Sequence, residues 1–259
     1  MITALFYCAN MITYFCLYGK FKLTYSDKYV IVFSKDQKGR IYMILYIIRH
    51  ADPDYEHNTI TEFGWEEARA LAAWFKDRRI DKIYTSPLGR AINTAEPTCE
   101  MKGMGYEILP WTEESMDYML SYQFTPDTDC SYSCSVKEGV HDFADFTGTE
   151  RMNTVNNMIK ESDAFLSSHG YTRKGLLYSV DRPNDDIIAV FCHGGFGCAW
   201  ISHLLGTAPG MMWPGISLNT SSVTTFEFRN EEKGFTRPVL RRLGEIAHIY
   251  DAGLRVNNR

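Results

Sequence analysis

The chain has 259 residues, a net charge of −5 and a hydrophobic fraction of 45%. This length suits one large α/β domain or two small ones, and the apolar content supports a sizeable core. A chain with this net negative charge lacks the excess of basic residues typical of nucleic-acid-binding proteins, so we expect no nucleic-acid partner. Seven cysteines without regular spacing favour reduced thiols in a cytoplasmic protein over a disulfide framework.

Residues 1–42 differ in composition from the rest of the chain. Residues 1–18 are apolar and aromatic, but Asn10 interrupts them and no positively charged segment precedes them. This pattern matches neither a signal peptide nor a membrane span, so we expect no membrane association. Residues 38–40 can be encoded wholly in purine codons, as in a ribosome-binding site, and Met43 follows closely. One hypothesis is therefore a start-site misassignment, with the native protein beginning at Met43; the alternative is a genuine N-terminal β extension or membrane anchor.

A continuous apolar run at residues 44–48 predicts a strand buried on both faces, as in parallel sheets. Arg49 and His50 follow at once. Because burying unpaired basic groups is costly, we expect them at the carboxyl end of the strand. Open α/β sheets bind their ligands at that edge. The pair indicates an anion site, with phosphate as the preferred anion; the alternative is a surface Arg-His pair ending an ordinary strand.

A helix is predicted after the turn-rich loop of residues 51–60. Thr61 is a suitable N-cap, and acidic residues in the following turns suit the helix dipole. His57 in the loop is interpreted as a solvated side chain outside the catalytic set. One apolar stripe has helical spacing and consists of Ala68, Leu71, Ala72 and Phe75.

Residues 81–99 contain a second informative pattern. Residues 83–84 predict a short strand, Ser86 is a candidate N-cap, and Pro87 suits the first position of a helix. Arg90 then falls in the first turn of that helix. A helix N-terminus beside an arginine suits an anion; the alternative is an arginine on a solvated helix face.

Residues 187–192 predict another buried strand, which ends at His193. Two buried strands thus each bring a histidine, His50 and His193, to the same edge of the sheet. His203 lies within the following helix and is interpreted as structural. Glycines after the second strand permit a tight exit and close backbone approach: Gly194, Gly195 and Gly197.

Four motifs together resemble the histidine phosphatase superfamily, whose fold is that of cofactor-dependent phosphoglycerate mutase. The resemblance spans about residues 43–228 and implies a three-layer α/β/α sandwich around a mostly parallel sheet. It also implies a phosphohistidine mechanism that needs no metal and no cofactor. The motifs are RHADPD at 49–54, TEFGWEEARALA at 61–72, TSPLGRAINTAEP at 85–97 and CHGGFG at 192–197.

The resemblance implies a role for each motif residue. His50 matches the nucleophile, Arg49 and Arg90 match the phosphate-binding arginines, and His193 matches the second pocket histidine, which serves both catalysis and phosphate binding. Two guanidinium groups and His193, if protonated, would neutralise a phosphomonoester dianion. His50 must attack as neutral imidazole, so its second nitrogen needs a hydrogen-bond acceptor that fixes the tautomer.

In the family, the general acid is usually a glutamate between the third and fourth of these motifs. The Pro-Trp step in residues 108–115 favours Glu114, with Glu113 as the next choice. This segment departs from the family pattern, because it lacks the Leu-Arg that often precedes the glutamate and the glycine that often follows it.

Residues 43–259 are expected to form the phosphatase domain, with a cap insertion at about 116–150. A helix is predicted near residues 153–168, a strand at 222–228 and a final edge strand within 238–250. Aromatic residues of the cap are candidates for a leaving-group site, the alternative being a loop that merely covers the pocket: Tyr118, Tyr122, Phe124 and Tyr132.

The sequence therefore predicts a phosphomonoester hydrolase that acts on a small phosphorylated metabolite. The alternatives are a phosphoglycerate mutase-type phosphotransferase and a phosphohistidine-protein phosphatase. After the Arg-His pair, mutases of this family carry a longer basic and Asn-containing stretch, and elsewhere an Arg-Arg-Ser segment; this chain has Ala51 and Asp52 after the pair and no such segment. Asp52 and Asp54, placed at the rim, would also disfavour a highly anionic substrate. Cys130 and Cys134 lack a partner pair at zinc spacing, so no metal is expected.

Overall fold

The computed structural model describes the backbone of residues 6–8, 11–14, 23–26, 42–118, 136–137, 140–141, 150–207, 215–230 and 234–257. Most of residues 1–42 and of the cap insertion therefore lie outside the described residues. The described parts of these two segments include short strands that form two small antiparallel sheets. They are β1 (Phe6–Cys8), β2 (Met11–Tyr14) and β3 (Leu23–Ser26) in one, and β9 (Val136–Lys137) and β10 (Val140–His141) in the other.

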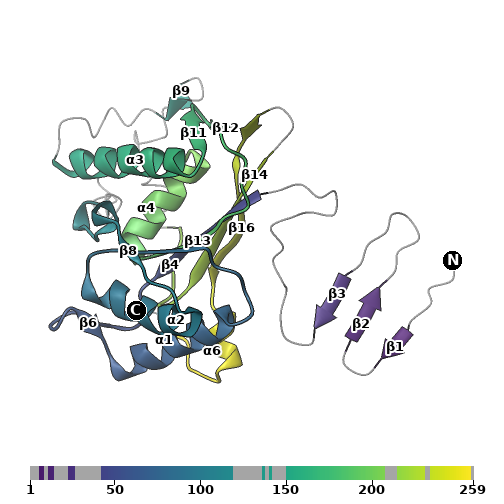
Figure 1. Cartoon of the computed structure of the whole chain (residues 1–259). Coiled ribbons are helices and arrows are strands. Elements are labelled where there is room, and N and C mark those ends of the chain that lie inside the picture. The colour runs from purple at the N-terminus through teal and green to yellow at the C-terminus, as the bar shows by residue number, and fades with distance from the viewer. Residues whose placement is uncertain are drawn as a thin grey trace.

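A six-stranded sheet in the order β16-β14-β4-β13-β7-β8 forms the centre of the fold (Figure 1). Strands β4, β13, β7 and β8 run parallel to one another, and β14 pairs antiparallel with both β4 and β16. The expected mostly parallel sheet is thus confirmed. The strand bounds are β4 (Tyr42–Arg49), β7 (Lys82–Thr85), β8 (Glu107–Ile108), β13 (Ile187–Cys192), β14 (Val223–Arg229) and β16 (Pro238–Glu245).

Helices cover both faces of this sheet (Figure 1). Helices α3 (Glu150–Ser168) and α4 (Gly194–Leu205) lie on one face. The opposite face is covered by α1 (Glu62–Phe75), α2 (Gly89–Lys102) and α6 (Ala247–Asp251). This is the predicted three-layer α/β/α sandwich.

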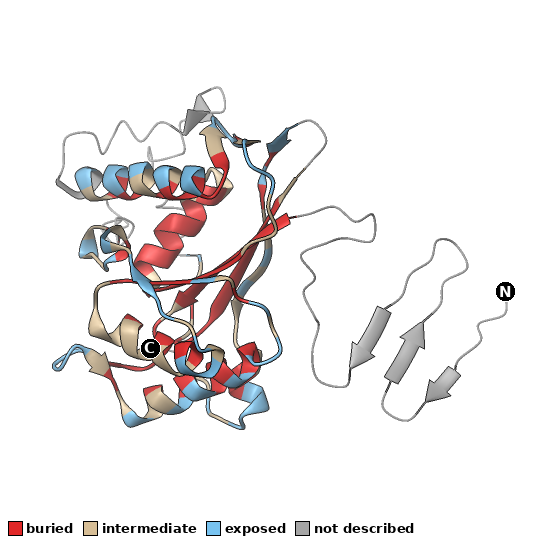
Figure 2. Cartoon of the chain, in the orientation of Figure 1, coloured by how far each residue is buried: buried red, intermediate tan, exposed pale blue. Residues whose placement is uncertain are grey.

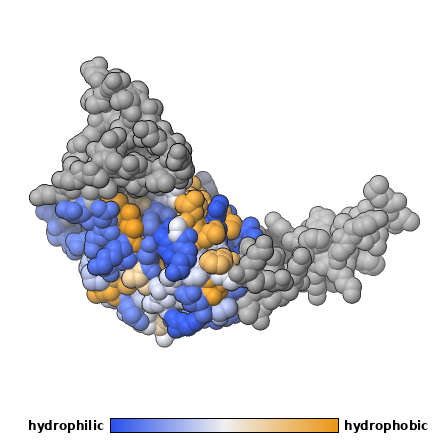
Figure 3. All heavy atoms as spheres, turned by 90° about the horizontal axis from the view of Figure 1, so that it is seen from above, coloured by the Kyte–Doolittle hydropathy of each residue, from blue (hydrophilic) through white to orange (hydrophobic). Residues whose placement is uncertain are grey.

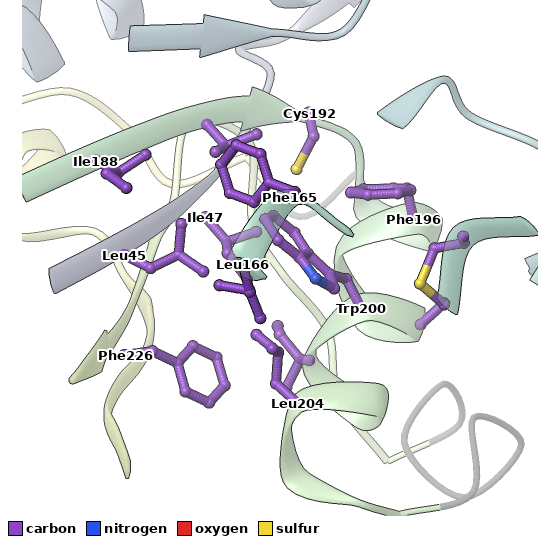
Figure 4. Packing of buried hydrophobic residues seen from close by; sticks show 14 of the residues in the cluster. Leu45, Ile47, Phe165, Leu166, Ile188, Cys192, Phe196, Trp200, Leu204 and Phe226 are labelled. Carbon is purple, nitrogen blue, oxygen red and sulfur yellow. The ribbon is translucent and has the colours of Figure 1, made fainter. Parts of the chain in front are cut away.

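Strand β4 supplies the core on both faces, because successive side chains of a strand point to opposite sides. Leu45 and Ile47 pack with Phe165 of α3 and Trp200 of α4 (Figure 4). The other face joins Tyr46 and Ile48 of β4 to the predicted stripe of α1, with members such as Leu71 and Phe75. Figure 2 shows the central strands and most of α4 as buried, in line with the apolar run of the sequence.

Several predicted boundaries differ from the observed ones. Helix α2 begins at Gly89, and its N-cap residue Leu88 makes no side-chain capping bond. Ser86 is therefore not the cap; its hydroxyl instead contacts a histidine described below. The expected edge strand ends at Glu245, and helix α6 follows it. Thr61 caps α1 as predicted, accepting a bond of 3.0 Å from the backbone N–H of Gly64.

Smaller elements complete the described structure. A three-stranded antiparallel sheet and a two-stranded one lie outside the central sheet, and one 3-10 turn follows β8. On the face seen in Figure 3, hydrophilic and hydrophobic residues are mixed. Among the described residues, no helix combines the length and the apolar character needed to cross a bilayer. The bounds are β11 (Tyr171–Lys174), β12 (Leu177–Val180), β15 (Phe235–Thr236), β5 (Pro53–Asp54), β6 (Thr59–Ile60) and η1 (Pro110–Thr112).

Candidate active site

The carboxyl ends of three parallel strands bring the predicted site residues together. In the ladder between β4 and β13, Arg49 lies opposite Cys192, so His50 and His193 leave the sheet side by side. The centroids of their two imidazole rings are 5.2 Å apart. The convergence of two histidines at one edge of the sheet, expected from the sequence alone, is thus present in the structure.

The tautomer of His50 follows from its surroundings. Its Nδ1 lies 2.7 Å from the carbonyl oxygen of Ala51, which can only accept a hydrogen bond. Nδ1 therefore carries the proton, and Nε2 keeps its lone pair. Burial lowers the pKa of His50 to about 3, against the opposing effect of the Ala51 carbonyl. The imidazole is thus neutral near pH 7, which is the state that a nucleophile requires.

Two guanidinium groups, those of Arg49 and Arg90, interact electrostatically with this pair of histidines. Arg49 donates from Nη1 to the carbonyl oxygen of Leu218. A Cβ on Gly194 would lie only 3.2 Å from Arg49 Nε, so the glycine after His193 allows Arg49 to lie close to the backbone. Arg90, in the first turn of α2, interacts electrostatically with both histidines. Arg49, Arg90, His50 and His193 therefore lie near one another at this edge of the sheet.

His193 is fully buried, and its Nε2 lies 2.7 Å from the hydroxyl oxygen of Ser86. Burial, together with the smaller effects of His50, Arg90 and Arg49, lowers the pKa of His193 to about 2. The sequence argument considered a protonated His193 as an aid to charge neutralisation. Burial beside two guanidinium groups favours the neutral imidazole instead.

Glu114 lies beside His193 at the N-terminus of α4. Its two carboxylate oxygens accept hydrogen bonds from the backbone N–H groups of Gly195, at 2.9 Å, and Phe196, at 2.8 Å. Burial raises the pKa of Glu114, while these two bonds and the charge of Arg90 lower it. The neighbouring Glu113 is exposed. Of the two glutamates considered from the sequence, the one placed within the site is therefore Glu114.

Three residues of the site were missed by the sequence analysis or given another role. Ser86 was read as a helix cap. Thr94 accepts a bond of 2.9 Å from the backbone N–H of Ala51 and donates to the carbonyl of Arg90. Glu67 is buried and accepts from the hydroxyl of Thr220 at 2.6 Å. The signals available were a threonine four residues after Arg90 and a glutamate within an otherwise apolar helix face.

The expected position of Asp52 at the rim is wrong. Asp52 is buried, and its two carboxylate oxygens accept from Thr61 Oγ1 at 2.8 Å and Asn257 Nδ2 at 2.5 Å. The reason is the chain reversal after His50, which pairs the carbonyl of Asp52 with the backbone N–H of Thr61. Asp54 stays accessible, and its carboxylate contacts His57, an exposed side chain as predicted.

Few residues of the cap insertion are described, and one of its candidate aromatic residues, Tyr118, is among them. Tyr118 is buried and packs edge-on against Phe196, with ring centroids 5.8 Å apart, so it belongs to the core. Within the described part of the chain, no group of three or more His, Cys, Asp or Glu could hold a metal ion. The other candidates from this region lie outside the described residues: Tyr122, Phe124, Tyr132, Cys130 and Cys134.

Residues 45–117 match the model of the histidine phosphatase superfamily (branch 1). Over this stretch the chain is similar to members of the histidine phosphatase superfamily. A relative described as a putative phosphoserine phosphatase 2, from Hydrogenobacter thermophilus, is 37% identical over 68 residues. That stretch is 23% of this chain and spans only 34% of the length of the relative.

Solved structures of several phosphatases have a similar fold over most of the chain. A mutant phosphoserine phosphatase from Entamoeba histolytica, in complex with phosphoserine, has a TM-score of 0.54 at 22% identity, over 80% of this chain and 99% of that one. A mycobacterial glucosyl-3-phosphoglycerate phosphatase has a TM-score of 0.53 at 19% identity, over 79% and 100%. A putative alpha-ribazole-5'-P phosphatase from Escherichia coli has a TM-score of 0.52 at 18% identity, over 78% and 96%. At these identities the likeness shows the fold.

Proposed function

We propose that this chain is a histidine phosphatase and hydrolyses phosphomonoesters of small metabolites through a phosphohistidine formed on His50. The observation that carries the proposal is the tautomer of His50, whose Nδ1 is bonded to the Ala51 carbonyl at 2.7 Å. This bond leaves the Nε2 lone pair for attack. Arg49 and Arg90 supply the positive charge that a phosphate dianion needs.

Two displacements complete the reaction. In the first, Nε2 of His50 attacks phosphorus, the bond from phosphorus to the leaving oxygen breaks, and Glu114 donates its proton to that oxygen. In the second, water attacks the phosphohistidine and gives a proton to the Glu114 carboxylate. Inorganic phosphate leaves, and His50 returns to its neutral form. The partly buried position of Glu114, which raises its pKa, supports its role as the acid.

Small phosphorylated carboxylates are the substrate class we favour. The similar proteins include a phosphoserine phosphatase, solved in complex with phosphoserine and also with 3-phosphoglyceric acid, and a glucosyl-3-phosphoglycerate phosphatase. Each of these ligands combines a phosphomonoester with a carboxylate. With Asp52 buried rather than at the rim, one argument against a small anionic substrate no longer holds.

We also propose residues 43–259 as the phosphatase domain, since the central sheet begins with β4 at Tyr42. A cytoplasmic location is supported by free, buried thiols in the described core: Cys99, Cys192 and Cys198.

The decisive experiment assays the purified chain on phosphoserine, 3-phosphoglycerate, glucosyl-3-phosphoglycerate, alpha-ribazole-5'-phosphate and a phosphohistidine peptide. Release of phosphate, with acid-labile phosphate trapped on the wild type and lost in His50→Ala, is expected. His57→Ala, which removes an exposed histidine outside the site, is the matched control and should retain activity. Transfer of the phosphoryl group to a second glycerate instead of water would indicate a mutase and overturn the hydrolase.

A further inference from the structure

We propose that Ser86 is a positioning residue, which holds neutral His193 in the tautomer that donates Nδ1–H to a phosphoryl oxygen. The inference deepens the proposed function and rests on it. It assigns a role to a side chain that the sequence suggested only as a helix cap.

The backbone fixes Ser86 in place. It directly follows β7, and its N–H donates to the carbonyl of Phe191 in β13 at 2.8 Å. This bond brings the end of β7 next to the residue that precedes Cys192 and His193. Ser86 is fully buried, as is His193, and the distance from Oγ to Nε2 is 2.7 Å. The contact therefore depends on strand pairing rather than on a mobile surface side chain.

The direction of this hydrogen bond follows from the second neighbour of the hydroxyl. The backbone N–H of Leu88 points at Ser86 Oγ over 3.4 Å, so the oxygen accepts there. Among the described residues, Nε2 of His193 is the acceptor within reach of the hydroxyl proton, so the bond that satisfies both groups runs from Ser86 to Nε2. A neutral imidazole that accepts at Nε2 carries its proton on Nδ1. That atom is buried and has no hydrogen-bond partner among the described residues, so it is the donor left for a ligand.

The tautomer of His193 decides whether its Nδ1 attracts or repels the oxygens of a phosphate. With the proton on Nε2, the lone pair of Nδ1 would face the oxygens of a phosphate dianion and repel them. With the proton on Nδ1, the same neutral ring attracts them. Arg49 and Arg90 already lie nearby and disfavour a third positive charge on the ring. The hydroxyl of Ser86 thus lets a neutral His193 donate a hydrogen bond from Nδ1 at a place where an imidazolium is disfavoured.

The two histidines then share a tautomer but expose opposite atoms. A carbonyl acceptor on Nδ1 leaves His50 with a free lone pair at Nε2, as nucleophile. A hydroxyl donor on Nε2 leaves His193 with a free N–H at Nδ1, as phosphate ligand. The two histidines therefore differ in role because the Ala51 carbonyl accepts a hydrogen bond from one ring and the Ser86 hydroxyl donates a hydrogen bond to the other.

The first test is nitrogen NMR of the ligand-free wild type with labelled histidine, assigned through His193→Gln. We expect a protonated Nδ1 and an unprotonated, hydrogen-bonded Nε2 on His193. In Ser86→Ala, the Nε2 signal should shift as its bond is lost. A wild type with the proton on Nε2 would overturn the proposal. Since no turnover is involved, this result is independent of whether the chain is a phosphatase.

The second test compares phosphate affinity and kinetics. Ser86→Ala should weaken binding of inorganic phosphate and lower kcat/KM by about tenfold, as for a weakened hydrogen bond to a charged group. Ser86→Thr keeps the hydroxyl and should restore most of both. Ser202→Ala, which removes another buried hydroxyl that bonds the Thr207 carbonyl, should change neither. Unaltered phosphate affinity in Ser86→Ala would refute the role of Ser86. If the affinity falls as expected but the wild type hydrolyses no phosphomonoester, only the proposed hydrolase activity is refuted.

Discussion

The carboxylate of Glu114 accepts a hydrogen bond of 2.8 Å from the backbone N–H of Phe196, in the first turn of α4. Its second oxygen accepts from Gly195 at 2.9 Å. The proposed general acid therefore also satisfies two free N–H groups of a helix N-terminus. These bonds orient the carboxyl group next to His193, and they oppose the effect of burial, which raises the pKa of Glu114.

Glu114→Gln should slow hydrolysis of alkyl phosphates by about 100-fold or more, because a poor leaving group needs a proton. The loss with p-nitrophenyl phosphate should be much smaller, since p-nitrophenolate leaves without one. Steady-state kinetics with both substrates measure the contrast. Glu113→Gln is the matched control, an exposed neighbour for which both rates should stay near those of the wild type. Equal losses with the two substrates in Glu114→Gln would assign the acid role to another residue.

Arg90→Lys should weaken phosphate binding by about tenfold or more while the fold is kept. Lysine retains the charge but not the planar fork that contacts two oxygens together. The inhibition constant of inorganic phosphate measures this change. Arg79→Lys alters an arginine that pairs with Asp81 and Asp185 on the surface, and should leave the constant unchanged. An unaltered constant in Arg90→Lys would remove Arg90 from the phosphate site.

Gly89→Ala should reduce both stability and activity. A Cβ at this position would lie 2.1 Å from the backbone oxygen of Asn58, so the loop or α2 has to shift. Overpacking of this kind costs about 1–3 kcal/mol, and the shift would displace Arg90, the next residue. Urea unfolding and phosphate inhibition measure the two effects. Gly105→Ala has no heavy atom within 4 Å of the added Cβ, and a loss of stability there would contradict the steric argument.

The free energy of unfolding should fall as the pH drops below about 6.5. Burial lowers the pKa of His50 and of His248 from 6.5 to about 3. Between these values the unfolded chain binds more protons than the folded one, so acid favours unfolding by about 1.4 kcal/mol per pH unit for each group. Urea unfolding across this range measures the slope. His248→Gln should make the slope shallower, and an equal slope in variant and wild type would contradict this account.

The periodicity and the ends of apolar runs were sufficient to predict the central features of the fold. Residues 44–48 could be recognised as a strand buried on both faces, because an uninterrupted apolar run has no side that tolerates water. Arg49, His50 and His193 could be placed at the edge of the sheet, since basic or polar side chains cannot continue such a strand inward. Thr61 could be recognised as a cap from its own chemistry.

The position of Asp52 and the partner of Ser86 were decided only by the tertiary structure. In sequence, Asp52 resembles any acidic loop residue, and only chain reversal brings it to Thr61 and Asn257. Ser86 has the chemistry of a helix cap, and only the pairing of β7 with β13 places its hydroxyl at His193. Local patterns determine which residue types end a strand, because that depends on nearest neighbours in the chain. Which nitrogen of each histidine is left free depends on atoms from distant segments, and these meet only when the sheet forms.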